Sequence, residues 1–335
     1  MSSVESSFTT FTSLPPSCVL FFPQDERRVV VGTYLLNEDA ESTEGKKTGS
    51  LLLYRMDEEG QLYHFPTSQF AFPPSNKYLR NLMASQQTHA ILDIKFSPHS
   101  PEVLAVAQSN GTLSFYHISN DTITLSSHHA LFDASILLLS VNFSPTAQHL
   151  AFTLSNGEVG IFSLESKEIT YQYSPHELEA WACEFTADGK GLYSGGDDSV
   201  LSLYDLEAKT QLWRDKKTHQ AGVTAILDRG NGTFLTGSYD EWLRIFDART
   251  RRVKGSIKLG GGVWRLQMRG EDSVLASCMH AGTRIVTVRD ESRPSIVAKF
   301  EEHESMNYGS HVHGVRLDTI ISCSFYDKRL CIWSL

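Results

Sequence analysis

The sequence predicts an all-β fold in which seven blades form a closed ring, a β-propeller. Three observations predict it. Similar short segments recur every 41 to 46 residues along most of the chain. Each repeat holds three short runs of apolar or alternating residues bounded by Gly, Asn, Asp or Pro, which is the pattern of β-strands. Seven such units with two insertions fill the 335 residues, so the sequence does not require a second domain.

The recurring segment is a turn followed by a strand. Its copies are Ser109–Tyr116, Ser155–Phe162, Asp197–Tyr204, Tyr239–Phe246, His280–Val286 and Tyr326–Trp333. The period is that of WD40 repeats, about 40–45 residues. We expect repeats at roughly 17–56, 89–118, 136–164, 176–206, 219–249, 261–288 and 303–335, with polar insertions at about 37–48 and 66–87.

The ring is expected to close through the N-terminus. The chain stops directly after a third strand, which leaves the last blade one strand short. Ser7–Thr12 alternates and can supply the fourth strand. This N-terminal strand would join the last blade and remove the open sheet edges.

Composition excludes several classes of protein. Hydrophobic residues make up 41% and charged residues 21%, and 18 Phe, 12 Tyr and 5 Trp can fill a core, so the chain is not disordered as a whole. The formal net charge of −9 argues against binding to nucleic acid or to an anionic membrane surface. No apolar run approaches 18 residues, and the N-terminus does not resemble a secretory signal.

The five cysteines, an odd number with no CxxC pair, argue against a disulfide framework or a zinc site. Reduced thiols fit a cytosolic or nuclear protein, and we expect a cytoplasmic one. We also expect a monomer.

Several repeats carry the residues of a structural hydrogen-bond network. In WD repeats a His, a Ser or Thr, an Asp and a Trp form one buried chain that rigidifies the blade. The corresponding sets are His219, Thr236, Asp240 and Phe246; His176, Ser194, Asp198 and Tyr204; and His303, Cys323, Asp327 and Trp333. For these residues a structural role is favoured over a catalytic one.

One rim of the ring collects the candidate site residues. Loops before first strands and turns between second and third strands lie on the same face of a propeller. They bring together Glu179, Trp181, Asp197, Tyr239, Glu241, Gly261, Trp264, His280, Tyr308 and Tyr326. The aromatics predict an apolar-walled mouth of the central channel, which suits a ligand site. Spacing alone favours the alternative, a protein-binding rim.

His280 departs from the network pattern. It stands where other turns carry Asp198, Asp240 or Asp327, and the loop before its unit, Gly260–Gly262, offers no His partner. An imidazole on an exposed turn suits proton transfer, and a solvated surface His is an equal alternative.

Common catalytic motifs are missing. The sequence has no GxSxG, HExxH, Walker GxxxxGK[ST] or GxGxxG opening a helix, and no defensible set of metal ligands. Cys278, beside the His280 turn, could be a nucleophile but is more simply a buried apolar residue.

A more specific pattern runs through the second half of the chain. Its pieces are His176–Trp181, Tyr193–Asp198, Thr236–Glu241, Gly261–Arg265, Ala276–His280, Glu302–Ser305 and Ser322–Asp327. This set resembles the diphthine methylesterase family, WD-repeat proteins of diphthamide biosynthesis that are also described as diphthine methyltransferases. The resemblance covers nearly the whole chain, and its Gly-Gly-Val-Trp-Arg and Cys-Met-His pieces are the most specific.

The resemblance implies an activity. It implies removal of a methyl ester from the methylated diphthine intermediate on elongation factor 2, before the freed carboxylate is amidated. This hydrolysis needs no cofactor. Diphthine carries a trimethylammonium group, and aromatic faces bind such cations. Trp181, Trp264, Tyr239, Tyr308 and Tyr326 are the expected cage.

For catalysis we expect His280 to act as the base, oriented by Glu179 or Asp197. Backbone N–H groups near Gly261 to Val263 would hold the oxyanion. Two alternatives stay open: a non-catalytic adaptor that binds elongation factor 2 or a trafficking complex, and, last, a methyltransferase, for which no methyl-donor site is recognisable.

Overall fold

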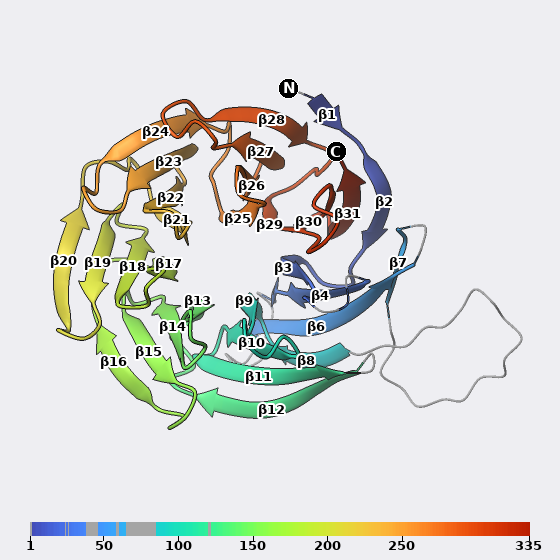
Figure 1. The fold of residues 1–335 in the computed structure, drawn as a ribbon. Coiled ribbons are helices and arrows are strands. Elements are labelled where there is room, and N and C mark those ends of the chain that lie inside the picture. The colour runs from blue at the N-terminus through green and yellow to red at the C-terminus, as the bar shows by residue number, and fades with distance from the viewer. Residues whose placement is uncertain are drawn as a thin grey trace, which may run out of the picture.

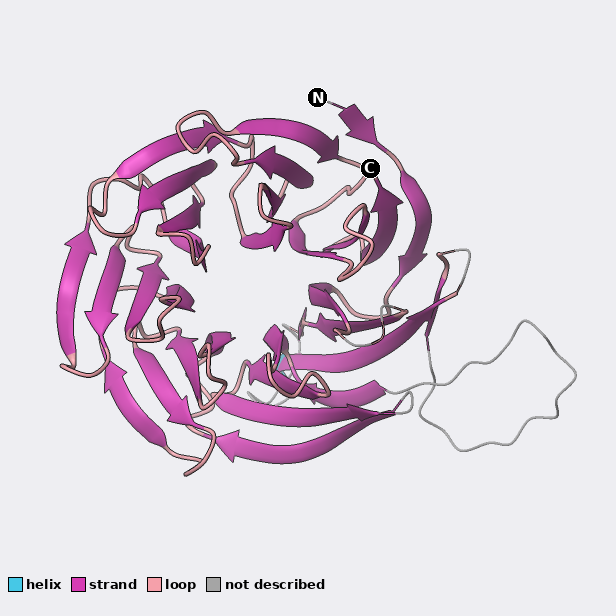
Figure 2. Ribbon diagram, in the orientation of Figure 1, coloured by secondary structure: helices cyan, strands magenta, loops and turns pink. Residues whose placement is uncertain are grey.

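The polypeptide is arranged as a ring of β-sheets around a central axis (Figure 1). The structure, a computed structural model, describes residues 2–23, 25, 27–37, 46–57, 60–64, 85–119 and 122–335. The elements named over these residues are all β-strands, and they form seven sheets (Figure 2). The predicted seven-bladed β-propeller is confirmed. Within the described residues no helix has the length and apolarity needed to cross a membrane.

Blades 2 to 6 are four-stranded antiparallel sheets whose strands follow one another in sequence. Blade 2 contains β9 (Ile91–Phe96), β10 (Val103–Gln108), β11 (Thr112–Ser119) and β12 (Thr122–Ala130). Blade 3 contains β13 (Leu138–Phe143), β14 (His149–Leu154), β15 (Val159–Ser163) and β16 (Ile169–Tyr173). Blade 4 contains β17 (Ala180–Phe185), β18 (Gly191–Gly196), β19 (Leu201–Asp205) and β20 (Thr210–Asp215). Blade 5 contains β21 (Val223–Asp228), β22 (Thr233–Ser238), β23 (Trp242–Asp247) and β24 (Val253–Lys258). Blade 6 contains β25 (Arg265–Arg269), β26 (Ser273–Ser277), β27 (Thr283–Thr287) and β28 (Ser295–Phe300).

Blade 1 differs from the expected layout. It contains β3 (Pro16–Phe21), β4 (Arg28–Thr33), β5 (Leu35–Leu36), β6 (Lys47–Met56), β7 (Leu62–His64) and β8 (Ser85–His89). Both β7 and β8 pair with β6, so together they make the outer strand. The insertion expected at 66–87 therefore ends inside β8, and the one expected at 37–48 ends inside β6. Residues 38–45 and 65–84 lie outside the described part of the chain.

The two chain ends close the ring. Blade 7 contains β29 (Asn307–Val312), β30 (Thr319–Ser324) and β31 (Arg329–Ser334), and its outer strand is the N-terminal β2 (Ser6–Phe11). The expected closing strand at residues 7–12 is confirmed as β2, which pairs with β31 in antiparallel orientation. The preceding strand β1 (Ser2–Val4) adds an unforeseen parallel pairing with β28 of blade 6. The N-terminus therefore bridges two blades.

Apolar side chains pack between neighbouring blades because each twisted sheet presents one face to the next. Between blades 4 and 5 the rings of Tyr193 and Phe234 stack at 4.4 Å. Between blades 6 and 7 Phe300 stacks on Trp333 at 4.9 Å, and both are fully buried. These interfaces hold the inner strands, and hence the rim loops, in fixed positions.

The structural networks form in part. In blade 4 His176 contacts the Asp198 carboxylate and the Ser194 hydroxyl, each at 3.0 Å. In blade 7 the hydroxyl between His303 and Trp333 belongs to Ser322, at 2.8 and 3.1 Å, and not to Cys323 as expected. The reason is register, because Cys323 pairs across the sheet with Gly309 and its thiol faces blade 1.

In blade 5 the network is split. His219 contacts the Thr236 hydroxyl at 2.9 Å. Asp240, expected to accept from His219, instead forms a two-pronged ion pair with Arg244, with distances of 2.8 and 3.0 Å. A guanidinium offers the carboxylate two parallel donors, which an imidazole cannot match.

These buried histidines predict acid lability. Burial lowers the pKa of both His219 and His303 to about 4. Both stay neutral in the folded protein while the unfolded chain takes up protons below about pH 6.5. Their contribution to stability is therefore complete above about pH 6.5 and is lost as the pH falls towards 4. We expect the free energy of unfolding to fall by up to about 1.4 kcal/mol per pH unit for each histidine.

Urea unfolding at pH 7, 6, 5 and 4.5 measures this slope. The variant His303→Gln should show a slope smaller by about one histidine, whatever its stability at pH 7. Equal slopes in the variant and the wild type would contradict the expectation.

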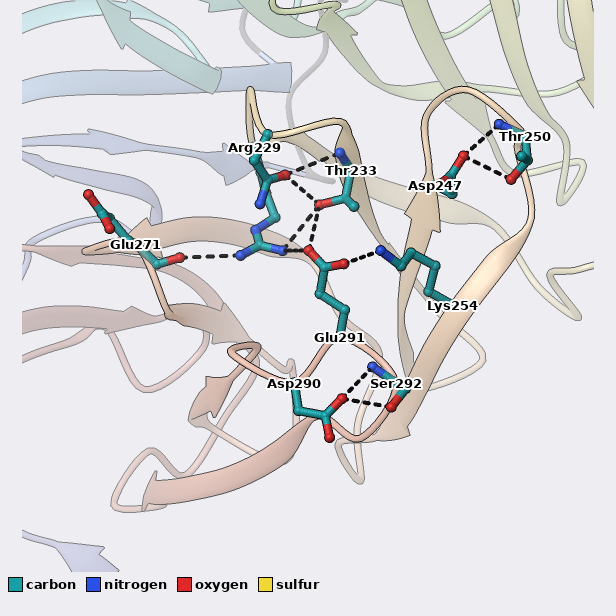
Figure 3. Close-up of polar contacts among 10 residues, drawn as sticks. Arg229, Thr233, Asp247, Thr250, Lys254, Glu271, Asp290, Glu291 and Ser292 are labelled. Atoms are coloured by element: carbon teal, nitrogen blue, oxygen red, sulfur yellow. Dashed lines mark hydrogen bonds and ion pairs between the residues drawn. The ribbon is translucent and has the colours of Figure 1, made fainter.

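The face of the ring opposite to the rim with the candidate site residues carries an ion-pair network (Figure 3). It joins the β21–β22 turn to the β27–β28 loop. Glu291 accepts from Arg229 at 2.7 Å and pairs with Lys254, and Arg229 also donates to the Thr233 hydroxyl at 3.1 Å. This network ties blade 5 to blade 6 far from the candidate rim, which makes Glu291→Gln a suitable control for changes on the rim.

Candidate functional site

A repeated backbone contact defines the rim. In most blades the turn between the second and third strands donates an N–H to the residue just before the inner strand. Examples are Asp197 to Glu179 at 2.8 Å, Tyr239 to Gly222 at 2.9 Å and Phe325 to Met306 at 3.0 Å. These turns and loops therefore lie side by side on one face, as the sequence predicts.

Four of the predicted aromatic residues form one cluster on this rim. The ring centroid of Trp264 lies 5.4 Å from that of Trp181, 5.8 Å from Tyr239 and 5.2 Å from Tyr308. Trp181 and Tyr239 are 6.4 Å apart. All four side chains are half-buried. Trp264 is thus the centre of the group, which we call the aromatic cluster.

The cluster continues across blade 7 into blade 1. Phe325 lies 5.4 Å from Tyr308, 5.1 Å from Tyr326 and 6.0 Å from Tyr34. Tyr326 is 68% exposed, so it sits at the edge of the group and not within it. Sequence reasoning missed Phe325 and Tyr34. Their position in the turn after the second strand, shared with Tyr239, is the signal that could have found them.

Carboxylates flank the aromatic cluster. The indole N–H of Trp181 donates to Asp197 at 2.9 Å. Burial raises the pKa of Tyr239, and the neighbouring Tyr308, Asp197 and Glu179 raise it further. The Tyr239 phenol therefore stays protonated, and the shift registers negative charge from two carboxylates beside the cluster. Aromatic faces next to negative charge form a favourable environment for a cation.

His280 lies beside the cluster without joining the expected catalytic group. Five residues, 278–282, separate the last paired residues of the two flanking strands, as residues 238–242 do in blade 5. In the blade 5 turn the residue with positive φ is Glu241, the fourth of the five. In the blade 6 turn the residues with positive φ are Met279 (42°) and Gly282 (74°). The reshaped turn leaves His280 exposed, and among the described residues nothing hydrogen-bonds its side chain. Met279 accepts from the Asn307 N–H at 3.0 Å, which holds the turn against the inner strand that carries Tyr308.

Glu179 and Asp197 do not contact His280 in the structure. Both belong to blade 4, whereas His280 belongs to blade 6, and blade 5 lies between them (Figure 1). One Asp197 oxygen is also occupied by Trp181. Both carboxylates act on the pKa of Tyr239 in the cluster, and an orienting role towards His280 finds no support in the geometry.

Gly261 has a packing role. It is buried, and a Cβ at this position would collide with the Cys278 carbonyl and lie 2.9 Å from the Ala281 Cβ. Of the backbone donors expected to hold an oxyanion, the Val263 N–H is already bonded to the Ser238 carbonyl at 2.9 Å. The loop therefore fixes the turn that carries His280, and Val263 cannot serve as an oxyanion donor.

Gly261→Ala should shift this turn. Overpacking of this kind costs about 1–3 kcal/mol, so we expect a lower melting temperature and reduced activity in any assay that depends on His280. The matched control is Gly314→Ala, where an added Cβ meets no atom within 4 Å. Thermal unfolding of the two variants checks the prediction, and similar behaviour of both would contradict it.

Cysteine and metal chemistry find no support on the rim. Burial raises the pKa of Cys278 to about 12, so its thiol is a poor nucleophile at neutral pH. All five cysteines are buried and free. Among the described residues no three His, Cys, Asp or Glu side chains gather as metal ligands would.

An ion pair joins two blades across the ring, and one of its residues follows Trp264 in the chain. Arg265, which follows Trp264, donates to Asp93 at 2.6 Å and to the Leu92 carbonyl at 3.1 Å. Blades 6 and 2 lie on opposite sides of the ring (Figure 1). Burial lowers the pKa of Arg265, but the neighbouring Asp93, together with Cys18 and Cys323, raises it overall. Sequence spacing gave no sign of this pair.

The fold and the rim define the class as a WD40 β-propeller protein. The family model described as "WD domain, G-beta repeat" matches residues 167–205. A chain in a crystal structure of the mitotic checkpoint complex has the same fold, with a TM-score of 0.74, 14% identity, and coverage of 98% of this chain and 95% of that one.

The chain belongs to the diphthine methyltransferase family. It is 34% identical to the Schizosaccharomyces pombe protein of that name, over 97% of this chain and 96% of that protein. The Saccharomyces cerevisiae diphthine methyltransferase is 27% identical, with 96% of each chain covered. The Dictyostelium discoideum homologue is 26% identical, over 97% of this chain and 98% of that protein. Membership implies a role in diphthamide biosynthesis and an enzyme that acts on methyl groups.

Proposed function

We propose that this protein hydrolyses the methyl ester of methylated diphthine on elongation factor 2. Water attacks the ester carbonyl carbon, the bond to the methoxy oxygen breaks, and methanol and a carboxylate are released together with one proton. The reaction uses no cofactor. We place it in the cytoplasm and assign it to a monomer.

The observation that carries the proposal is the aromatic cluster with its flanking carboxylates. Diphthine carries a trimethylammonium group, which has no N–H and cannot donate a conventional hydrogen bond. Aromatic faces bind such a cation by about 1–2 kcal/mol each when water is excluded. Trp181, Tyr239, Trp264 and Tyr308 provide these faces, and Asp197 adds negative charge beside them.

His280 is the proposed base. It is exposed on the same rim and its imidazole is not engaged by any described residue. It would accept the proton from the attacking water. Because no side chain among the described residues orients it, the bound substrate loop has to supply part of that orientation.

The test is methanol release. Purified protein is mixed with elongation factor 2 that carries the methylated diphthine intermediate, and the mass of the modified peptide is followed. We expect a loss of 14 mass units together with one equivalent of methanol. A gain of 14 units on addition of a methyl-donor nucleotide would instead indicate a methyltransferase.

A non-catalytic adaptor is the second candidate. The exposed Tyr326 and the lack of a nucleophile motif favour it, because exposed aromatics on a WD40 rim are typical of protein-binding surfaces. This candidate predicts tight binding to elongation factor 2 without any change in its mass. A folded preparation that binds but does not release methanol would select it.

A further inference from the structure

In the ion pair between Arg265 and Asp93, the aspartate is buried and the arginine is partly accessible to solvent. The Asp93 side chain is 1% exposed and the Arg265 side chain 24%. Asp93 also accepts the N–H of Ile94 at 3.0 Å and of Val141 at 3.1 Å. With the bond from Arg265, the carboxylate accepts three hydrogen bonds, which fix it in a position that orients the guanidinium.

Some N–H groups of Arg265 have no hydrogen-bond partner among the described residues. A guanidinium has five N–H groups, and the described residues take two of them, through Asp93 and the Leu92 carbonyl. The Nε–H is buried without a partner among the described residues, so the donors left for a ligand are the second N–H groups of Nη1 and Nη2. A fork held from one side with unused donors on the other can bind a second oxygen ligand.

The guanidinium lies at the level of the aromatic cluster. It reaches the carbonyl of Leu92, which is the second residue of the inner strand β9. Trp181 is likewise the second residue of the inner strand β17, and Tyr308 is the second residue of β29. Trp264, the centre of the cluster, directly precedes Arg265. The guanidinium thus reaches across the ring at a similar position along the inner strands as the rings of the aromatic cluster.

We propose that Arg265 binds the carboxyl group of a ligand whose quaternary ammonium lies in the aromatic cluster. The ligand class is a betaine or its ester, in which a cation and a carboxyl oxygen sit a few bonds apart. The inference rests on the proposed function for the identity of the natural ligand. In that reaction Arg265 touches the ester carbonyl and stabilises the negative charge that develops on its oxygen.

The ion pair with Asp93 is compatible with this assignment. With Asp93 the guanidinium pair carries no net charge, so a neutral ester can approach without losing a strong ion pair. The ammonium of the ligand offsets the charge of the carboxylate once the ester is cleaved. A charge-assisted hydrogen bond then favours the carboxylate over an uncharged group.

Binding of two small probes tests the proposal on the full chain. Glycine betaine carries a trimethylammonium and a carboxylate, whereas choline carries the same cation and a hydroxyl. Both are titrated while tryptophan fluorescence is followed, because a cation on Trp181 or Trp264 changes their emission. We expect the wild type to bind glycine betaine about tenfold more tightly than choline.

The key variant is the double change Arg265→Gln with Asp93→Asn, which leaves no uncompensated buried charge. It should bind choline as the wild type does and lose the preference for betaine. Arg265→Lys, which keeps the charge without the fork, should lower the preference to about threefold and serves if the double variant does not fold. Glu291→Gln, on the opposite face, should keep the full preference.

The proposal is overturned if the wild type shows no preference for betaine. It is also overturned if the folded double variant keeps that preference, or if Arg265→Lys keeps it at wild-type strength. The proposed function fails separately. If the wild type prefers betaine through Arg265 but releases no methanol, the esterase proposal falls and Arg265 stands as the carboxylate ligand. If methanol is released and the preference does not depend on Arg265, only this inference falls.

Discussion

Replacing Trp264 by Leu is expected to lower kcat/KM for ester hydrolysis by about 30- to 100-fold. Trp264 lies within ring-contact distance of Trp181, Tyr239 and Tyr308. Leucine keeps most of the apolar volume but has no π face, so about 2 kcal/mol of cation binding is lost. Since each factor of ten corresponds to about 1.4 kcal/mol, that loss is about 30-fold, and disorder of the neighbouring rings adds to it.

The matched change is Trp264→Phe, which retains an aromatic face. It should cost only about three- to fivefold, because Phe is a weaker cation binder than Trp. Initial rates of methanol release at several substrate concentrations separate the two variants. Equal losses in Leu and Phe would show that Trp264 contributes shape and not its π face. Melting temperatures close to the wild type are expected for both, since Trp264 is only half-buried.

The seven-bladed fold was predictable because its determinants are local and repeated. Each blade needs short apolar runs and turns with Gly, Asn or Asp, and these recur at fixed spacing. The closing strand was predictable for the same reason, since residues 7–12 alternate and pair with β31. The parallel β1–β28 pairing was not, because the three residues Ser2–Val4 are too few to show a pattern that indicates a partner strand.

The aromatic cluster was predictable from topology alone. Loops before inner strands and turns after second strands must share a face in any propeller, so Trp181, Tyr239, Trp264 and Tyr308 had to come near one another. The pattern could not predict contacts between side chains that extend across the ring from blades that are not neighbours. Arg265 and Asp93 are 172 residues apart and belong to blades that are not neighbours, so only the closed structure joins them.

Two errors have different physical causes. In blade 7 Ser322 takes the place expected of Cys323, because a shift of one residue in a strand exchanges the two faces of the sheet. In blade 5 Arg244 pairs with Asp240 in place of His219, because its guanidinium offers two parallel donors. Matching residue types to a repeat pattern resolves neither case.

Replacing His280 by Ala is expected to lower kcat by about 10²- to 10³-fold with little change in melting temperature. General base catalysis contributes rate factors of this size. The fold should tolerate the change, because the side chain is exposed and no described residue hydrogen-bonds it. The control is His99→Ala, another exposed histidine, which contacts the Pro145 carbonyl at 2.9 Å at a turn on the opposite face. That variant should retain full turnover.

Chemical rescue separates a base from a residue that only shapes the turn. If His280 removes a proton from water, added imidazole should restore part of the rate of His280→Ala and should do nothing for Trp264→Leu. A variant with full activity would rule out His280 as the base. A variant that is inactive and not rescued would assign His280 to substrate placement, since loss of a contact cannot be replaced by a free base. Because Glu179 and Asp197 lie two blades from His280, changes at these carboxylates should raise KM through the cation and leave the rescue intact.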